Sequence, residues 1–377
     1  MRVAVPWQGN QFGATFLPRR GQEVQVGFVN GDPDLPIIVG SVINAFNMPA
    51  HALPSNQALS GVRSREIGGG RSNALVFDDT NGKIQVQLGS DEGSSQLNLG
   101  YITRIAGNAG RQDERGIGAE LRTDGHGVFR AGKGMLLTTE VRTNGLGPMK
   151  DTGETAQRLA QACELQENLT ALAQQHRAQE LNGDQSDVTR AIRAQNDGIR
   201  GGMQQATDLF PEFHEPYVTV ASPVGIQTTT AGSTHIASDQ NLAVTAGGHV
   251  AFAAGRSFFA TVRNGLSLFV QMLGIKLIAA SGRVRVEAQS DSVEVIAQKV
   301  LELMSTTDWI NIKAKKGVML NGGGSTLVVS PEGIVGYTDG KVLLHCASFS
   351  KAGAQSKPLD LPSFPTGNTN DTRPFSL

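Results

Sequence analysis

The sequence predicts a mainly β protein, in which a small barrel precedes a long stack of short strands interrupted by a helical insert. Glycine is frequent, with 46 residues among 377, whereas aromatic residues make up only 5%. Apolar pairs recur at a nearly fixed interval in the C-terminal half, and one central segment changes to a helical periodicity. Short strands joined by tight turns fit this composition better than large layered cores do.

Residues 1–47 are predicted to form a partial β-barrel. Val24–Phe28 alternates apolar with small or polar residues, as a half-buried strand does. Asn30–Pro33 is a turn signal, and Ile37–Val42 begins the next strand. Because the alternation begins abruptly, we expect one or two further barrel strands upstream of residue 1.

Residues 48–71 are predicted to be a linker. Proline and glycine discourage regular structure there, at Pro49, Pro54 and Gly68–Gly70. Residues 72–150 are predicted to be the first part of a β-shaft domain. Strand-like runs return in this segment, at Ala74–Phe77, Ile84–Leu88 and Met135–Thr138.

Residues 151–207 are predicted to be a helical insert. A heptad-like stripe with alternating spacings of three and four residues contains Ala162, Leu165, Leu169, Leu172 and His176. A second amphipathic piece contains Val188, Ile192, Ile199 and Met203. Thr152 is predicted to cap the first helix. We interpret the segment as a helical hairpin inserted into a β domain, and an independent partner-binding helix is the alternative.

The repeat lies in residues 208–347, the predicted repetitive β-helix shaft. The step is about eight or nine residues, so each unit has about five residues of strand and three of turn. The apolar pairs are Ile226/Thr228, Leu242/Val244, Val250/Phe252, Leu266/Leu268, Ile275/Leu277, Val284/Val286, Val293/Val295, Ile310/Ile312, Val318/Leu320, Leu327/Val329 and Val342/Leu344.

Strands this short cannot enclose a core within one chain. A solitary stack leaves one apolar face in water, and burying each Val or Leu is worth roughly 1.5–3 kcal/mol. Several identical chains winding around one axis bury that face and close the sheet edges. The short period and the one-sided pattern therefore predict a trimer. A single-chain parallel β-helix is the competing fold, but its coils usually need longer repeats.

Residues 348–377 are predicted to be a flexible C-terminal tail, with a composition rich in Pro, Ser, Thr and Asn. Its apolar residues are Leu359, Leu361, Phe364 and Phe375. One interpretation is an unstructured terminus. The alternative is a docking tail for a tip protein, an adaptor or an effector, which orders on binding.

Sequence motifs for catalysis, cofactors or metals are absent. The formal net charge of −1 gives no electrostatic case for nucleic-acid binding. The seven histidines form no ligand motif, and no nucleophile elbow or phosphate loop occurs. Asp78 and Asp79 are adjacent in a strand and point to opposite faces, so a turn role is favoured over paired acid/base work. We therefore predict a protein without catalytic, cofactor or metal residues.

Several segments resemble VgrG, the spike of the type VI secretion system, and the related central spike of contractile-tailed phages. The similar segments are Val3–Asn10, Pro18–Val24, Gly31–Ile37, Ser60–Arg65, Asn73–Asp79, Leu97–Tyr101, Glu120–Gly125 and Arg130–Thr139. The resemblance extends to about Lys351 and implies an OB-type barrel followed by an intertwined trimeric β-helix/β-prism shaft. It further implies a PAAR-repeat tip protein, carried effectors and a tube of Hcp rings. The larger N-terminal domains that contact the tube are expected to lie outside this sequence.

The sequence thus predicts a non-enzymatic, membrane-puncturing homotrimer that carries a tip protein and effectors into target cells. The alternative is a phage-like tail spike that binds or cleaves a surface polysaccharide, which predicts paired carboxylates and aromatic sugar platforms. A fused C-terminal toxin is a third possibility, but the chain ends too soon after the shaft for a catalytic domain. No signal peptide or run of about 18 apolar residues is present, so we expect a cytoplasmic protein that type VI secretion later delivers.

Overall fold

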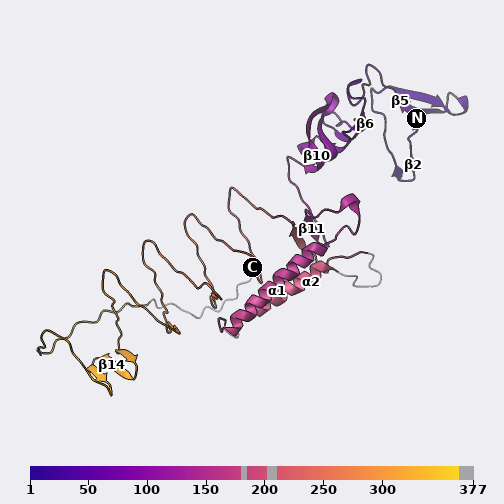
Figure 1. Cartoon of the computed structure of the whole chain (residues 1–377). Coiled ribbons are helices and arrows are strands. Elements are labelled where there is room, and N and C mark those ends of the chain that lie inside the picture. The colour runs from indigo at the N-terminus through magenta and orange to yellow at the C-terminus, as the bar shows by residue number, and fades with distance from the viewer. Residues whose placement is uncertain (180–184, 202–209, 365–377) are drawn as a thin grey trace. The chain divides into compact units, whose positions relative to one another are not determined.

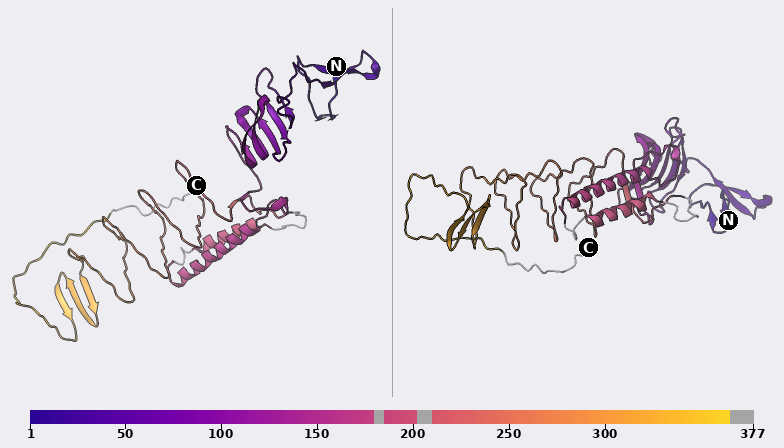
Figure 2. Two further views of the ribbon diagram at one scale, coloured as in Figure 1. Left: turned by 45° about the horizontal axis from the view of Figure 1, so that its top comes forward. Right: turned by 60° about the horizontal axis from the view of Figure 1, so that its bottom comes forward.

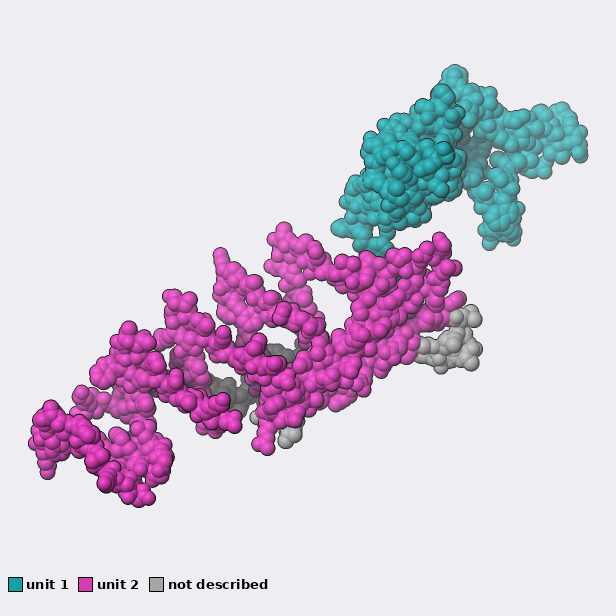
Figure 3. Space-filling view, viewed as in Figure 1, with its two compact units in different colours: residues 1–132 teal, residues 133–377 magenta. Residues whose placement is uncertain are grey.

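The computed structural model describes residues 1–179, 185–201 and 210–364. The chain divides into two compact units, residues 1–132 and 133–377, which Figure 3 colours separately. Strands outnumber α-helices among the described residues, and both α-helices there lie in the second unit (Figure 1). The prediction of a mainly β protein is confirmed. Short 3-10 turns lie at Val29–Gly31, Glu92–Ser94, Gly107–Ala109 and Thr143–Gly145.

The first unit begins with a small three-stranded sheet. Its order is β1 (Arg2–Val3), β5 (Pro36–Ser41) and β4 (Val24–Phe28), and a separate ribbon pairs β2 (Gln8–Gly9) with β3 (Phe12–Gly13). The predicted strands at 24–28 and 37–42 are confirmed. The sheet is open within residues 1–47, all of which are described, so their place in a barrel stays a prediction.

A larger five-stranded antiparallel sheet completes the first unit. Its order is β10 (Gly110–Arg122), β9 (Ser95–Ala106), β8 (Gln85–Ser90), β7 (Asn73–Asp78) and β6 (Leu59–Arg63). β6 lies inside the predicted linker, so the expectation of irregular structure throughout 48–71 is wrong. The prolines precede β6 and the glycines follow it, and neither interrupts the five residues that pair with β7.

The second unit holds a helical hairpin between two paired strands. β11 (Met135–Thr138) pairs in parallel with β12 (Val218–Ala221), and α1 (Gly153–Gln175) and α2 (Ser186–Arg200) lie between them in the sequence. The predicted hairpin is therefore confirmed, although Met203 lies outside the described residues. Neither described helix is long and apolar enough to cross a bilayer.

Small and polar side chains, rather than the predicted apolar stripe, form the buried side of α1. Ala156, Cys163 and Thr170 are buried and repeat every seven residues, whereas Leu169 of the predicted stripe is exposed. From α2, the Asn196 side-chain amide donates to the Leu159 carbonyl oxygen at 2.9 Å. Small residues let the two helices approach closely enough for such bonds, whereas Ala162, Leu165 and Leu172 of the stripe are half-buried.

The first turn of α1 also differs from its prediction. Thr152 occupies the N-cap position, but its hydroxyl donates to the Ile199 carbonyl oxygen of α2 at 3.2 Å and does not cap α1. Asp151 instead accepts a hydrogen bond from the Gly153 amide at 3.1 Å. Arg142 binds both Asp151 and Glu154, at 2.9 and 2.7 Å, and so ties the start of the helix to the preceding loop.

After β12 the chain forms a regular zigzag without secondary structure (Figure 1). Residues 222–317, all described, contain no helix, strand or hydrogen-bonded turn. Bends instead recur every eight residues, at 223–224, 231–232, 239–240, 247–248, 255–256 and 263–264, and slightly further apart beyond them. The predicted step is confirmed. A three-stranded antiparallel sheet follows, formed by β13 (Val318–Gly322), β14 (Ser325–Ser330) and β15 (Gly333–Tyr337).

Candidate functional site

The zigzag run at residues 223–317, here called the shaft run, presents its apolar side chains in repeated pairs. Side chains two residues apart on an extended segment point the same way, so the two members of each pair share one side. Both members are 50–79% exposed in the pairs Leu242/Val244, Val250/Phe252, Leu266/Leu268, Ile275/Leu277, Val284/Val286, Val293/Val295 and Ile310/Ile312. No packed core within the run covers them.

The backbone of the shaft run forms no strand ladder within the run. No backbone-to-backbone hydrogen bond joins two residues of the run, which is described throughout. Figure 3 shows open gaps between successive turns of this part of the chain. Extended segments with free N–H and C=O groups are templates for pairing with another chain. The run is therefore a candidate interface between copies of this chain.

The sheet after the shaft run extends the same apolar character. The register places Val318, Val329 and Ile334 in one row across the three strands, and Leu320 opposite Leu327 on the same face. All but Val318 are exposed, and Val318 is partly so. This face, like the shaft run, lacks a covering layer within the described chain.

The helical hairpin lies alongside the shaft run (Figure 2). Thr245 donates its hydroxyl hydrogen to the Gln166 side-chain oxygen at 3.1 Å. The rings of His176 and Phe269 stack with centroids 5.3 Å apart. A hollow of about 460 Å³ remains between hairpin and run, and its apolar lining includes Leu159, Ala162, Val188, Ile192, Ile199 and Leu242. The hairpin thus contacts separate turns of the run, at Thr245 and Phe269, and leaves an apolar hollow beside Leu242.

Two carboxylates, Glu66 and Glu92, line a pocket of about 200 Å³ and are the kind of pair that sugar cleavage requires. Both bind the Arg71 guanidinium, Glu66 at 2.6 Å. The Arg71 side chain lowers the pKa of Glu66, whereas a general acid needs a raised pKa. No aromatic side chain lines this pocket. Its chemistry does not favour the polysaccharide-cleaving alternative.

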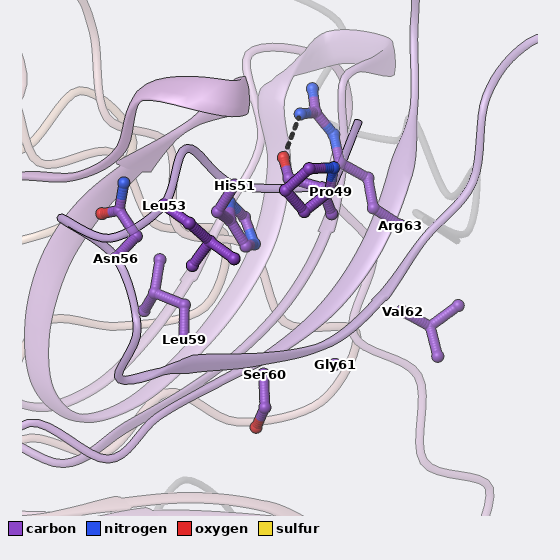
Figure 4. Close-up of a pocket in the computed structure, with 10 residues that line it drawn as sticks. Pro49, His51, Leu53, Asn56, Leu59, Ser60, Gly61, Val62 and Arg63 are labelled. Atoms are coloured by element: carbon purple, nitrogen blue, oxygen red, sulfur yellow. Dashed lines mark hydrogen bonds between the residues drawn. The ribbon is translucent and has the colours of Figure 1, made fainter. Parts of the chain in front are cut away.

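A smaller pocket of about 150 Å³ lies between the segment at residues 49–56 and β6 (Figure 4). The His51 ring nitrogen Nδ1 lies 3.1 Å from the Gly107 carbonyl oxygen, and Arg63 donates to the Ala50 carbonyl oxygen at 3.5 Å. No carboxylate or nucleophilic cysteine lines the pocket. These polar groups hold the chain segment in place and provide no acid/base pair.

Metal and thiol chemistry are likewise unsupported by the described residues. No cluster of three or more His, Cys, Asp or Glu side chains there has the arrangement of a metal site. Burial raises the pKa of the Cys163 thiol, which lies at the helix interface, so its reactive thiolate form is disfavoured. Asp78 accepts hydrogen bonds from Thr80 in a turn and pairs with Arg111 at 3.0 Å, in line with the predicted turn role.

The structure describes three of the four apolar residues of the predicted docking tail. Leu359, Leu361 and Phe364 are each more than a third exposed, and Phe375 lies outside the described residues. Between Leu359 and Leu361, the Asp360 carbonyl oxygen accepts a bond from Lys313 Nζ at 3.4 Å. Partner binding by the tail stays a prediction.

Three family models match successive parts of the chain. Residues 1–42 match a type VI secretion system/phage-baseplate injector OB domain. Residues 65–173 match a putative type VI secretion system Rhs element Vgr. Residues 205–355 match an uncharacterized protein conserved in bacteria (DUF2345), and this match includes the whole shaft run.

Among curated proteins, the type VI secretion system spike protein VgrG2b of Pseudomonas aeruginosa is 32% identical over 98% of this chain. The chain spans 36% of that relative's length, about a third. The actin cross-linking toxin VgrG1 of Vibrio cholerae is 42% identical, but over only 23% of this chain and 8% of its own length.

Two solved structures are also similar. The VgrG spike from the type 6 secretion system matches with a TM-score of 0.64 and 28% identity, over 76% of this chain and 99% of that one. The structure of the Tle1 effector bound to the VgrG spike from the type 6 secretion system matches with a TM-score of 0.64 and 27% identity. The match covers 77% of this chain and 82% of that one. With the family matches and the curated relative, these likenesses show that the chain belongs to the VgrG family of type VI secretion spike proteins.

Proposed function

We propose that this chain forms part of a membrane-puncturing type VI secretion spike, as a homotrimer. The observation that carries the proposal is the shaft run, whose apolar pairs are exposed and whose residues share no backbone-to-backbone hydrogen bond. Three copies wound around one axis bury the pairs and hydrogen-bond the strand edges. The relatives named as spike proteins support the proposal.

The proposed mechanism is mechanical and needs no catalytic residue. A trimer in which nearly every strand bonds to another chain is stiff and unfolds slowly, so it can transmit axial force. The relatives named as spike proteins support this structural role, whereas the relative named an actin cross-linking toxin matches only 23% of this chain.

The proposed partners bind at the two ends of the spike. A PAAR-repeat tip protein and an effector or adaptor bind at the C-terminal end, and the Hcp tube binds through regions outside this sequence. The solved spike with bound Tle1 supports effector carriage by this family. The proposed location is the cytoplasm before firing and the target cell afterwards.

Amide hydrogen exchange over residues 223–317 tests the trimeric shaft. In a single chain these amides have no backbone partner within the run and exchange within seconds. The proposal predicts that most of them are protected for hours in the purified protein. Exchange as fast as in a denatured control contradicts it.

Deletion of residues 352–377 tests the tail. If the tail carries a tip protein or an effector, pull-down of that partner falls at least tenfold while the shaft amides stay protected. As a matched control, replacing Leu359, Leu361 and Phe364 with serine removes the described apolar groups and keeps the tail length. Unchanged recovery with both variants rejects the docking role.

A further inference from the structure

The helical hairpin contacts the shaft run at two positions that are equivalent in the repeat. Thr245 and Phe269 each lie two residues before a bend, and they are 24 residues apart, which is three of the eight-residue steps. Beside the second contact, the Ser267 hydroxyl donates to the Ala178 carbonyl oxygen at the end of the first helix. The hairpin therefore meets the run once in three steps and follows one side of it.

These contacts lie opposite the apolar pairs. Thr245 directly follows Val244, and Phe269 directly follows Leu268. Neighbouring side chains on an extended segment point to opposite sides. Thr245 and Phe269 are half-buried, whereas nearly every other residue of the run is exposed. The hairpin thus covers the side of the run that the apolar pairs do not use, and it leaves the pairs accessible.

Helix α1 fixes the distance between the two contacts. Gln166 binds Thr245, and His176 stacks on Phe269. His176 still belongs to the helical ladder, since its amide donates to the Leu172 carbonyl oxygen at 3.1 Å. Ten residues of α-helix rise about 15 Å, so three steps of the run advance about 15 Å along α1, or about 5 Å a step. Neighbouring strands of a sheet lie about 4.8 Å apart, so each step advances by one strand spacing.

The rise per step sets the space between segments on the same side of the run. Segments three steps apart lie about 15 Å apart there, which is about three strand spacings. Two further strands fit between them. A smaller rise leaves no room for both strands, and a larger rise holds the edges too far apart to form hydrogen bonds.

We propose that the hairpin is a folding guide, which sets the rise of the shaft run within a single chain before other strands pair with it. No ladder within the run can set this rise, because no backbone-to-backbone hydrogen bond joins two of its residues. Helix α1 can set it, because its 23 residues form a continuous ladder of fixed length. The hairpin also forms from local contacts, which fold faster than distant ones. The guide itself needs no second copy, and its role in spike assembly rests on the proposed trimer.

Refolding kinetics of the full chain test the guide. Thr245→Val with Phe269→Ala removes both contacts, and Thr261→Val with Phe259→Ala is the matched control at exposed positions of the same run. A guide acts while the run forms, so protection of the shaft amides is expected to return about tenfold more slowly after dilution from denaturant. The rate at which protection is lost in denaturant is expected to stay the same. Unchanged recovery, or equal slowing by the control, overturns the inference.

A distance within one chain tests the guide without any partner. Spin labels are attached to Gln240→Cys and Asn264→Cys, at bends three steps apart, after Cys346→Ser has removed the exposed cysteine. The labels are measured in a shaft variant that is monomeric by mass, Val293→Asp with Val295→Asp. The guide predicts a narrow distance distribution, with the two backbone positions about 15 Å apart. A free chain of this length spans roughly 25–30 Å.

These distances separate the guide from the proposed spike. A broad distribution near the free-chain value overturns the guide, whether or not the parent protein is a trimer. A narrow distribution that persists in Thr245→Val with Phe269→Ala also overturns it, because the rise then has another source. A monomeric parent protein overturns the proposed function, and the distance measured in that parent then decides on the guide alone.

Discussion

The helical hairpin and the shaft run belong to one unit but differ in where their partners lie. In the hairpin, Asn196, Cys163 and Thr189 are buried and meet across the two helices. In the shaft run, no large apolar side chain is buried and no backbone-to-backbone hydrogen bond joins two residues. The two helices of the hairpin pack against each other within one chain. The shaft run has regularly spaced bends but neither buried apolar side chains nor backbone pairing of its own. The difference indicates that the missing contacts come from other copies of the chain.

The largest effect is expected from charge in the shaft run. Val293→Asp with Val295→Asp places two carboxylates on the apolar side, where burying each costs several kcal/mol and forfeits about 1.5–3 kcal/mol of apolar burial. We expect loss of the trimer, with association weakened more than 1,000-fold in sedimentation velocity. The matched control is Glu294→Lys, which lies between them on the opposite side of the strand and is exposed. Equal loss with the control contradicts the one-sided interface.

A smaller effect is expected from the buried ion pair of the first unit. The Asp78 side chain is fully buried and bonds to Arg111 at 3.0 Å. Arg111→Met leaves that carboxylate without its cation and costs about 3–5 kcal/mol. The control Arg104→Met removes an exposed pair with Asp113, worth about 0–1 kcal/mol. Urea denaturation, monitored by hydrogen exchange in β7, measures the loss of stability in both variants. Equal losses of stability contradict the importance of the buried ion pair.

The hairpin is expected to respond locally. Asn196→Ala leaves the Leu159 carbonyl oxygen without its side-chain donor and costs about 1–3 kcal/mol. Faster hydrogen exchange in α1 and α2 is expected, with no change in the mass of the assembly. Asp197→Ala, on the exposed side of α2, is the control. Dissociation of the trimer by Asn196→Ala alone shows that the hairpin, too, depends on its neighbours.

The smallest effect is the pH dependence of the five-stranded sheet of the first unit. Hydrogen bonds from Arg115 and then Asn98 hold the pKa of Glu120 below its ordinary 4.5. A depressed folded pKa contributes stability above the unfolded value, and this stability is lost as the pH falls through the folded value. Thermal stability is therefore expected to decline below about pH 4.5, and less steeply in Glu120→Gln. Identical slopes show that Glu120 does not contribute.

The repeat, the hairpin and several strands could be predicted because periodicity alone specifies them. Leu242/Val244 and the later pairs mark the zigzag, and the change of spacing after Asp151 marks the helices. The features that the sequence did not predict depend on contacts between elements that are far apart in the chain. β6 needs β7 as its partner, and the buried side of α1 is set by the approach of α2 at Leu159 and Cys163.

Which face of the five-stranded sheet is buried was the feature hardest to predict from the sequence. Gln85, Val86, Gln87 and Leu88 alternate as a half-buried strand does, and the ordinary reading places valine and leucine inside. The structure buries the two glutamines, because Gln85 bonds to Thr103 and Gln87 to Asn98. Only the register with β9 reveals these partners, so the exposed apolar face of this sheet has no local signal in the sequence.

The mass of the full chain in solution tests the central claim most directly. The shaft interface predicts a species near three times the 39.8 kDa of one chain in sedimentation equilibrium, stable to dilution into the nanomolar range. A folded species of 39.8 kDa, with residues 223–317 protected from exchange, contradicts the account, because the run then finds its partners within one chain.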